Sequence, residues 1–268
     1  MGIKCIYHAN CSDGFGAAWA LRYGRPNDDI EFIPASYGDE IPDVTKDDTV
    51  FILDFSYKRP EICKLASQAH IVLIVDHHKT AEAELVDLPD NVECIFDMNK
   101  SGAMLAWECF VGGQPPKLIE HIQDRDLWQF KLEGTKEIIA ALFSYDFDFD
   151  VWDKLMRDDQ IPSLRAEGVA LQRKMLKDIN SVIESNAYTT TIAGYTVPVL
   201  NAPYMWASEA GNILCKGQPF AAIYGETKDR IHYSLRSEKG AVDVSEIAAK
   251  FGGGGHANAA GFSLPRKS

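Results

Sequence analysis

An acid and two histidines, Asp76, His77 and His78, directly follow the unbroken apolar run at residues 71–75. Such a run is typical of a strand buried on both faces, as in a parallel sheet covered by helices. In open α/β sheets, ligands bind just beyond the carboxyl ends of the strands. Because imidazole and carboxylate groups together bind divalent transition metals, this triplet could form part of a metal site.

Two other predicted strands end in side chains of the same kinds. Residues 3–7 are followed by His8 and Asp13, and residues 49–53 are followed by Asp54. A single strand-terminal Asp is more often the cap of the next helix, and a single His is usually structural. Three such ends in one series of strands and helices, however, meet at one edge of one sheet. We therefore expect one site for divalent metal there.

The order of the elements predicts an α/β fold. Strands are expected at residues 3–7, 31–34, 49–53, 71–75 and 92–96, and helices at 17–22, 60–69, 101–107 and 118–122. Strands that alternate with helices in this way build a parallel sheet. At 268 residues the chain exceeds a typical domain of roughly 100–200 residues, so we expect two domains.

A long amphipathic helix is predicted over residues 162–185, where apolar side chains recur at helical spacing. Beyond it the pattern changes to short β-rich segments separated by turns, with helices expected at 208–214 and 244–251. The prediction is a first domain over 1–162, a helical connector over 163–187 and a smaller α/β domain over 188–268. Residues 143–152, rich in Asp and aromatic side chains, are expected to form a peripheral surface, with a ligand cluster as the alternative.

Composition narrows the range of partners. A net charge of −12 argues against a protein that binds long nucleic acid by neutralising many phosphates. From Thr190 onward, eight basic residues outnumber six acidic ones, so the C-terminal part could bind phosphate. Six cysteines without CxxC spacing suit reduced thiols, and no apolar run approaches the ~20 residues that span a bilayer. We expect a cytoplasmic protein with no membrane partner, and a homodimer is left open.

Several motifs resemble those of the DHH/DHHA1 phosphoesterase family. They are VDHHKT after the buried strand, LDFS at an earlier strand end, and FGGGGHANAAGF near the C-terminus, with SLRS before it. The resemblance spans nearly the whole chain. It implies an N-terminal DHH domain with a parallel sheet, a helical connector, a smaller DHHA1 domain and an active site in the cleft between the domains. It also implies hydrolysis of phosphate esters or anhydrides with two divalent ions, Mn²⁺ before Mg²⁺, Co²⁺, Fe²⁺ or Zn²⁺.

The resemblance assigns a role to each matching residue. Asp54, His77 and His78 would be catalytic, with Asp54 bridging both ions and Asp76 supporting the site from behind. The implied metal ligands are His8, Asp13, Asp54, His77 and Asp124. The implied substrate-binding residues are His78, Arg236, Gly254, Gly255 and His256.

The first motif departs from the family pattern. The family commonly has a His, three residues, an Asp, one residue and a second Asp, but here four residues separate His8 from Asp13. In this alignment Asp13 takes the first acidic position and Phe15 replaces the second acid. One metal site then lacks a ligand, unless water, Cys11 or another residue completes it.

The fourth motif is ambiguous, because Asp124 and Asp126 both fit it. We choose Asp124, which closely follows the predicted helix at 118–122.

The favoured function is a metal-dependent phosphodiesterase acting on short oligonucleotides or linear dinucleotides, because no long basic groove is evident. One alternative is a nucleoside 3′,5′-bisphosphate phosphatase or a single-strand exonuclease. Another is a nucleotide-binding regulatory protein whose metal site has degenerated, which the departure in the first motif would favour.

Overall fold

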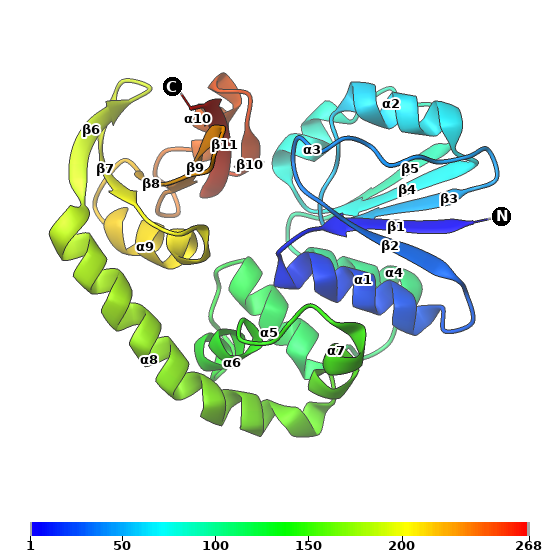
Figure 1. Ribbon diagram of the computed structural model, residues 1–268, viewed down its shortest axis with the longest axis horizontal. Helices are drawn as coiled ribbons and strands as arrows, with labels where there is room; N and C mark the ends of the chain where they lie inside the picture. The colour runs from blue at the N-terminus through cyan, green and yellow to red at the C-terminus, as the bar shows by residue number, and fades with distance from the viewer. Residues whose placement is uncertain (1, 267–268) are drawn as a thin grey trace. The chain divides into compact units, whose positions relative to one another are not determined.

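The computed structural model describes residues 2–266. The chain divides into two compact units, one up to Gln172 and one from Arg173 onward, and the division falls within helix α8 (Ile161–Asn186). Each unit contains its own sheet (Figure 1). The predicted α/β class is confirmed.

The sheet of the first unit is entirely parallel, with the strand order β2-β1-β3-β4-β5. Its strands are β1 (Ile3–His8), β2 (Ile30–Ala35), β3 (Thr49–Leu53), β4 (Ile71–Asp76) and β5 (Val92–Phe96). Leu53 at the end of β3 is in register with Tyr7 of β1 and Val75 of β4. The residues that follow these three positions therefore emerge side by side at one edge of the sheet.

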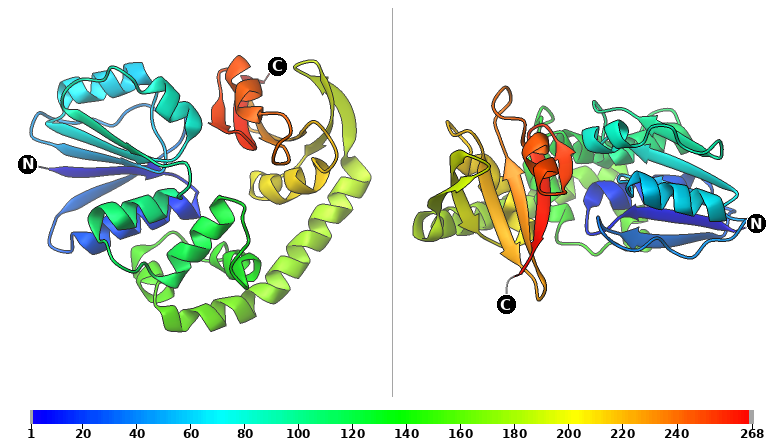
Figure 2. Two further views of the ribbon diagram at one scale, coloured as in Figure 1. Left: turned by 180° about the vertical axis from the view of Figure 1, so that it is seen from behind. Right: turned by 90° about the horizontal axis from the view of Figure 1, so that it is seen from above.

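Helices cover both faces of this sheet (Figures 1 and 2). On one face lie α1 (Ser12–Gly24) and α4 (Gly102–Phe110), and on the other lie α2 (Arg59–Gln68) and α3 (Lys79–Glu84). Successive residues of the central strands enter different cores: Phe51 and Val75 pack on the α1 side, Ile52 and Ile74 on the α2 side. Burial on both faces is why these strands are apolar at nearly every position.

The first unit continues with α5 (Lys117–Asp126), α6 (Thr135–Leu142), α7 (Phe149–Leu155) and a 3₁₀ turn at Asp158–Gln160. The expectation of a peripheral surface at residues 143–152 is wrong for part of this stretch. Trp152 is fully buried, and the rings of Phe149 and Trp152 lie 4.7 and 4.9 Å from that of Phe15. Aspartates alternate with aromatic residues in this stretch, so the sequence did not reveal the apolar face that forms when α7 folds.

The second unit is built on a six-stranded mixed sheet with the order β10-β11-β9-β8-β7-β6, in which only the β7–β8 pair is parallel. The strands are β6 (Tyr188–Ile192), β7 (Tyr195–Asn201), β8 (Ala221–Glu226), β9 (Arg230–Arg236), β10 (Gly254–His256) and β11 (Ala259–Pro265). A 3₁₀ turn (Tyr204–Trp206) and α9 (Ala207–Leu214) form the β7–β8 crossover. Two cores lie against this sheet, one with Ile179 of α8 and Ala210 of α9, the other with Ile247 of α10 (Val244–Lys250).

Among residues 2–266, no helix combines the length and the apolar character that crossing a bilayer requires.

Candidate metal centre

The ends of β1, β3 and β4 bring His8, Asp54 and Asp76 together, because these strands are neighbours in register. Asp54 is the first residue beyond β3 and has a left-handed backbone with φ 63°, while its N–H donates to the carbonyl of Val75 at 2.9 Å. Asp is among the few residues that adopt this conformation without a large penalty. The turn directs the Asp54 carboxylate into the centre instead of along the strand.

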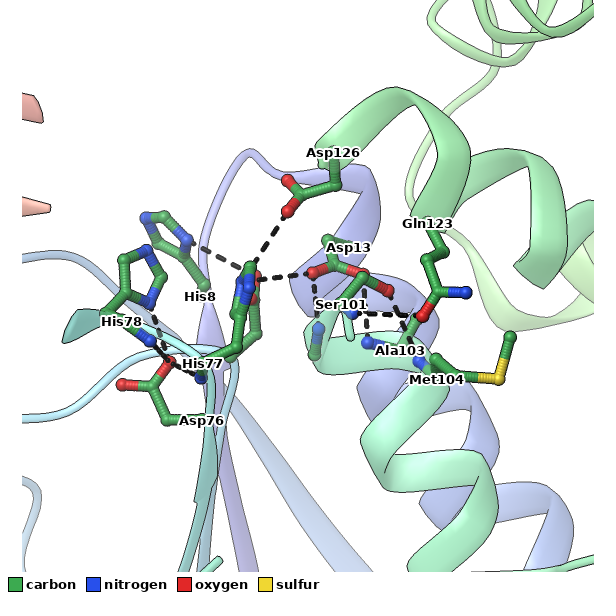
Figure 3. A network of polar contacts seen from close by, with 12 residues as sticks. His8, Asp13, Asp76, His77, His78, Ser101, Ala103, Met104, Gln123 and Asp126 are labelled. Carbon is green, nitrogen blue, oxygen red and sulfur yellow. Dashed lines mark hydrogen bonds and ion pairs between the residues drawn. The ribbon is translucent and has the colours of Figure 1, made fainter. Parts of the chain in front are cut away.

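One group of ligands surrounds the ring of His77. Its Nε2 lies 3.1 Å from Oδ1 of Asp54, 3.5 Å from Oδ2 of Asp13 and 3.6 Å from Oδ2 of Asp126. Figure 3 shows Asp13 and Asp126 pointing toward the His77 ring from α1 and α5. Donor atoms about 2.0–2.2 Å from a common ion would be separated by distances of this order. The set of three carboxylates and one imidazole fits a divalent cation.

A second group lies on the other side of Asp54. Its Oδ2 atom is buried, accepts no hydrogen bond and lies 3.4 Å from Nδ1 of His8. Donor atoms of His8, Cys11 and Asp54 all lie within 4.8 Å of one another. The two oxygens of Asp54 therefore face two different groups, which is the arrangement that a carboxylate bridging two ions requires.

Asp76 organises the turn that carries the two histidines. Its Oδ1 accepts hydrogen bonds from the backbone N–H groups of His77 (2.7 Å) and His78 (3.3 Å) and lies 2.6 Å from Nδ1 of His78. The carboxylate is fully buried. Asp76 thus holds the ring of His78 and the backbone of His77 from behind the centre.

The N-terminus of α4 holds Asp13. The backbone N–H groups of Gly102 and Ala103 donate to its two carboxylate oxygens at 2.6 and 2.9 Å, while Oγ of Ser101 accepts from Met104 as the helix cap (Figure 3). A Cβ at Gly102 would lie 2.5 Å from Cβ of Asp54. Only glycine permits this approach, so Gly102 is a positioning residue that sequence reasoning missed. The sequence offers one indication of this role, the pair Ser101-Gly102 at the start of an apolar helix.

Asp126 lies beside His77, whereas the carboxylate of Asp124, the expected ligand, contacts a loop. The Asp124 carboxylate accepts hydrogen bonds from the N–H groups of Lys131 and Leu132 and from Oγ1 of Thr135, at 2.7, 3.0 and 2.6 Å. It closes the loop from α5 to α6. The expectation assumed a helix ending near residue 122, whereas α5 continues to Asp126 and orients the two acids differently.

The departure in the first motif also has a different explanation from the one expected. Phe15 does not stand at a ligand position: it is buried in the core, against Phe149 and Trp152. Asp13 lies beside His77, and the residue two positions earlier, Cys11, lies beside His8 and Asp54. The geometry favours an alignment in which Asp13 takes the second acidic position and Cys11 the first.

Burial and contact with one another shift the pKa values of these groups. Burial alone lowers the pKa of His8 and His77, but contact with Asp54 outweighs it and raises the pKa values to about 12 and about 10. Burial and the neighbouring charges of Asp54 and Asp126 raise the pKa of Asp13 well above its usual range. Burial would raise the pKa of Asp54 too, yet the adjacent imidazoles hold it well below its usual value. A divalent cation would relieve this crowding of acids.

The expected phosphate-binding residues lie in the second unit. Arg236 ends β9, and its guanidinium donates to Oγ of Ser208 and to the carbonyl of Leu235, both at 2.8 Å. His256 ends β10 and pairs with Ala259 of β11, which in turn pairs with Arg236. Arg236 and His256 therefore occupy one row across three strands, on one face of the sheet. Gly254 and Gly255 precede His256 in β10.

Comparison with known proteins shows which family the chain belongs to. Residues 209–268 match the DHHA1 domain model. The chain is 34% identical to the uncharacterized protein R106 of Acanthamoeba polyphaga mimivirus over 286 residues, covering 97% of this chain and 66% of that protein. It is 25% identical to oligoribonuclease NrnB of Bacillus subtilis (strain 168) over 295 residues, covering 98% and 70%. The chain belongs to the DHH/DHHA1 phosphoesterase family. It spans about two thirds of the length of these two relatives.

Two solved structures share the DHH/DHHA1 fold with this chain. RecJ from Thermus thermophilus in complex with Mn²⁺ matches with a TM-score of 0.54 at 13% identity, over 98% of this chain and 49% of that one. PggH, a pGpG-specific phosphodiesterase from Vibrio cholerae, matches with a TM-score of 0.51 at 17% identity, over 99% and 94%. The residues that match the DHHA1 model all lie in the second unit.

Proposed function

We propose that this chain is a divalent-metal-dependent phosphodiesterase that cleaves the phosphodiester bonds of short oligonucleotides or linear dinucleotides. The observation that carries the proposal is Asp54, whose two oxygens face two separate groups of ligands 3.1 and 3.4 Å away. NrnB is an oligoribonuclease and PggH a pGpG-specific phosphodiesterase, which supports the same class of substrate here. Mn²⁺, present in the RecJ neighbour, is the ion we propose first, and two ions the number.

His8 and Asp54 would hold one ion, and Asp13, Asp54, His77 and Asp126 the other. Two cations held there would lower the pKa of a water molecule and stabilise charge on the attacking and leaving oxygens. Asp76 holds the ring of His78 and the backbone of His77, so that the ligand geometry does not have to reorganise during the reaction. Because Nδ1 of His78 lies 2.6 Å from Oδ1 of Asp76, His78 would contact the substrate through Nε2.

The second unit would supply phosphate binding. Arg236 offers a planar guanidinium, which recognises phosphate with two parallel hydrogen bonds. Gly211 of α9 leaves room for its side chain, since a Cβ there would lie 2.7 Å from Cγ of Arg236. His256, Gly254 and Gly255 lie in the adjacent hairpin, where the backbone can approach a ligand closely. A net charge of −12 supports a short substrate over a long strand.

The test uses metal-stripped protein, restored with Mn²⁺ and offered three substrates: a dinucleotide, a nucleoside 3′,5′-bisphosphate and a long single strand. Mononucleotide release from the dinucleotide, at a kcat/KM above those for the other two, is the expected result. Preference for the bisphosphate or the long strand would replace this function with one of the alternative activities. Nucleotide binding without turnover of any substrate would indicate a regulatory protein instead.

Two variants complete this test. Asp54→Asn keeps a residue that tolerates the left-handed backbone but removes the bridging carboxylate, so we expect turnover to be lost. Arg236→Ala should raise KM for the dinucleotide and leave the bound metal unchanged. Equal loss of metal from both variants would overturn the assignment of Arg236 to the substrate. Cytoplasmic location and a homodimer stay predictions.

A further inference from the structure

We propose that Cys11 is a thiolate ligand of the centre, so that its His8 half prefers a borderline ion such as Zn²⁺, Co²⁺ or Fe²⁺ over Mn²⁺ or Mg²⁺. This inference rests on the proposed metal centre and deepens it, because it restricts the proposed Mn²⁺ to the half that contains His77 and assigns a different chemical character to the other half. The inference depends on one observation: donor atoms of His8, Cys11 and Asp54 lie within 4.8 Å of one another.

The local backbone explains why Cys11 faces the centre. Asn10 has a left-handed conformation with φ 53°, which reverses the chain between His8 and Cys11. Gly14 then packs against the same strand end, where a Cβ would overlap with the carbonyl oxygen of His8. These two positions fold the segment from His8 to α1 tightly enough for the Cys11 side chain to reach the His8 and Asp54 groups.

The Cys11 side chain has no structural task at the start of the helix. Cys11 is the N-cap residue of α1, with extended backbone angles of φ −128° and ψ 130°, yet its side chain makes no capping hydrogen bond. A free cysteine ordinarily behaves as a small apolar residue, as Cys5 does in the core beneath. Cys11 is only partly buried and lies among ionisable groups instead.

The two halves of the centre therefore differ in chemistry. The His77 half contains three carboxylates and one imidazole, a set of mainly oxygen donors that suits Mn²⁺ or Mg²⁺. The His8 half adds a sulfur donor to one imidazole and the shared carboxylate of Asp54. Thiolate is a soft ligand and favours Zn²⁺, Co²⁺ and Fe²⁺. The centre as a whole is predicted to hold two different ions.

The experiment titrates Co²⁺ into the metal-stripped protein and records the thiolate-to-cobalt charge-transfer band in the near ultraviolet. The wild type is expected to show this band, and Cys11→Ser to lose it while keeping the visible bands of cobalt bound by nitrogen and oxygen. Cys11→Asp should bind two ions without the band and shift the preference of the His8 half toward Mn²⁺ by about 10–100-fold.

Cys109→Ser is the matched control, because Cys109 is exposed on α4 and should leave the band unchanged. Two bound Co²⁺ ions per wild-type chain without a charge-transfer band would overturn the role of Cys11 and leave the proposed function standing. A band that persists in a folded Cys11→Ser protein would overturn it equally. Failure of the wild type to bind any Co²⁺, Zn²⁺ or Mn²⁺ would overturn the metal centre itself, and this inference with it.

Discussion

Asp124 and Asp126 lie two residues apart at the end of α5 but direct their carboxylates to different partners. Oδ2 of Asp126 lies 3.6 Å from Nε2 of His77, whereas both oxygens of Asp124 accept hydrogen bonds from the loop that leads to α6. Asp124 is buried, and Asp126 is about a quarter exposed. We therefore propose Asp126 as the metal ligand and Asp124 as a residue that stabilises the fold.

Asp126→Asn should lower metal affinity and kcat/KM by at least about 100-fold, beyond the 10–100-fold typical of supporting residues, with little change in melting temperature. Asp124→Asn should instead lower the free energy of unfolding by about 1–3 kcal/mol, because an amide has a single accepting oxygen and its NH₂ group cannot accept the remaining hydrogen bonds. Metal analysis and thermal melting of the two variants separate the roles. The reverse pattern would restore Asp124 as the ligand.

Gly102→Ala tests how closely α4 supports the centre. The added Cβ would lie 2.5 Å from Cβ and 2.6 Å from Oδ1 of Asp54, so the carboxylate has to move. We expect metal affinity to fall by about 10–100-fold. Gly113→Ala is the control: its φ of 69° makes alanine unfavourable by about 1–2 kcal/mol, but no atom lies within 4 Å of the new Cβ. Equal metal affinity in both variants would contradict the positioning role.

Phe15 should prove to be a core residue. Phe15→Leu is expected to destabilise the protein by about 1–3 kcal/mol through lost contact with Phe149 and Trp152, while the bound metal stays at the wild-type amount. Phe15→Asp should fail to fold, since it buries a carboxylate among aromatic rings. A folded Phe15→Asp protein with tighter metal binding would instead show that this position is the missing acid.

Metal affinity should rise with pH. Contact with Asp54 overcomes burial and raises the pKa of His8 to about 12 and that of His77 to about 10, while burial raises the pKa of the Cys11 thiol. These protons must leave before the groups can bind a cation, so binding releases protons. Calorimetric titration in buffers of different ionisation enthalpy counts them. An affinity independent of pH between about 6 and 9 would contradict the protonated state of the free centre.

The same shifts predict the stability of the metal-free protein. A histidine whose pKa is raised on folding stabilises the protein fully below its ordinary pKa of about 6.5, and this contribution is lost as pH rises through the folded value. For His77 that window ends at about 10. Melting temperature should therefore fall between neutral and alkaline pH in the metal-free protein, and the fall should be smaller in His77→Gln.

The sequence was sufficient for the features that depend on local pattern. Apolar runs ending in His8, Asp54 and Asp76 identified three strand ends, and parallel pairing requires such ends to meet at one edge. The helix and strand series of the first unit followed for the same reason. The long helix predicted over residues 162–185 was equally evident from the spacing of its apolar residues, and the structure has α8 over residues 161–186.

Features that depend on contacts distant in sequence could not be read in this way. Asp13 is held by backbone N–H groups of Gly102 and Ala103, some 90 residues away, and no side-chain pattern records such a bond. The β10–β11 hairpin was not predicted, because glycine has low strand propensity and the hairpin joins the sheet through the pairing of β11 with β9. Asp124 was chosen over Asp126 as the metal ligand because the residue at which a helix ends is uncertain from a sequence pattern.

Asp54 has a left-handed backbone, is fully buried and lies close to the carboxylate of Asp13. Burial and the charge of Asp54 raise the pKa of Asp13 well above its usual range, so a cation that relieves this repulsion would act as a folding ligand. An ion at a thousandfold excess over its dissociation constant adds about 4 kcal/mol, a large share of the roughly 5–15 kcal/mol that stabilises a typical protein. Under metal starvation the polypeptide should unfold and be degraded sooner, so metal supply would set its abundance in the cell as well as its rate.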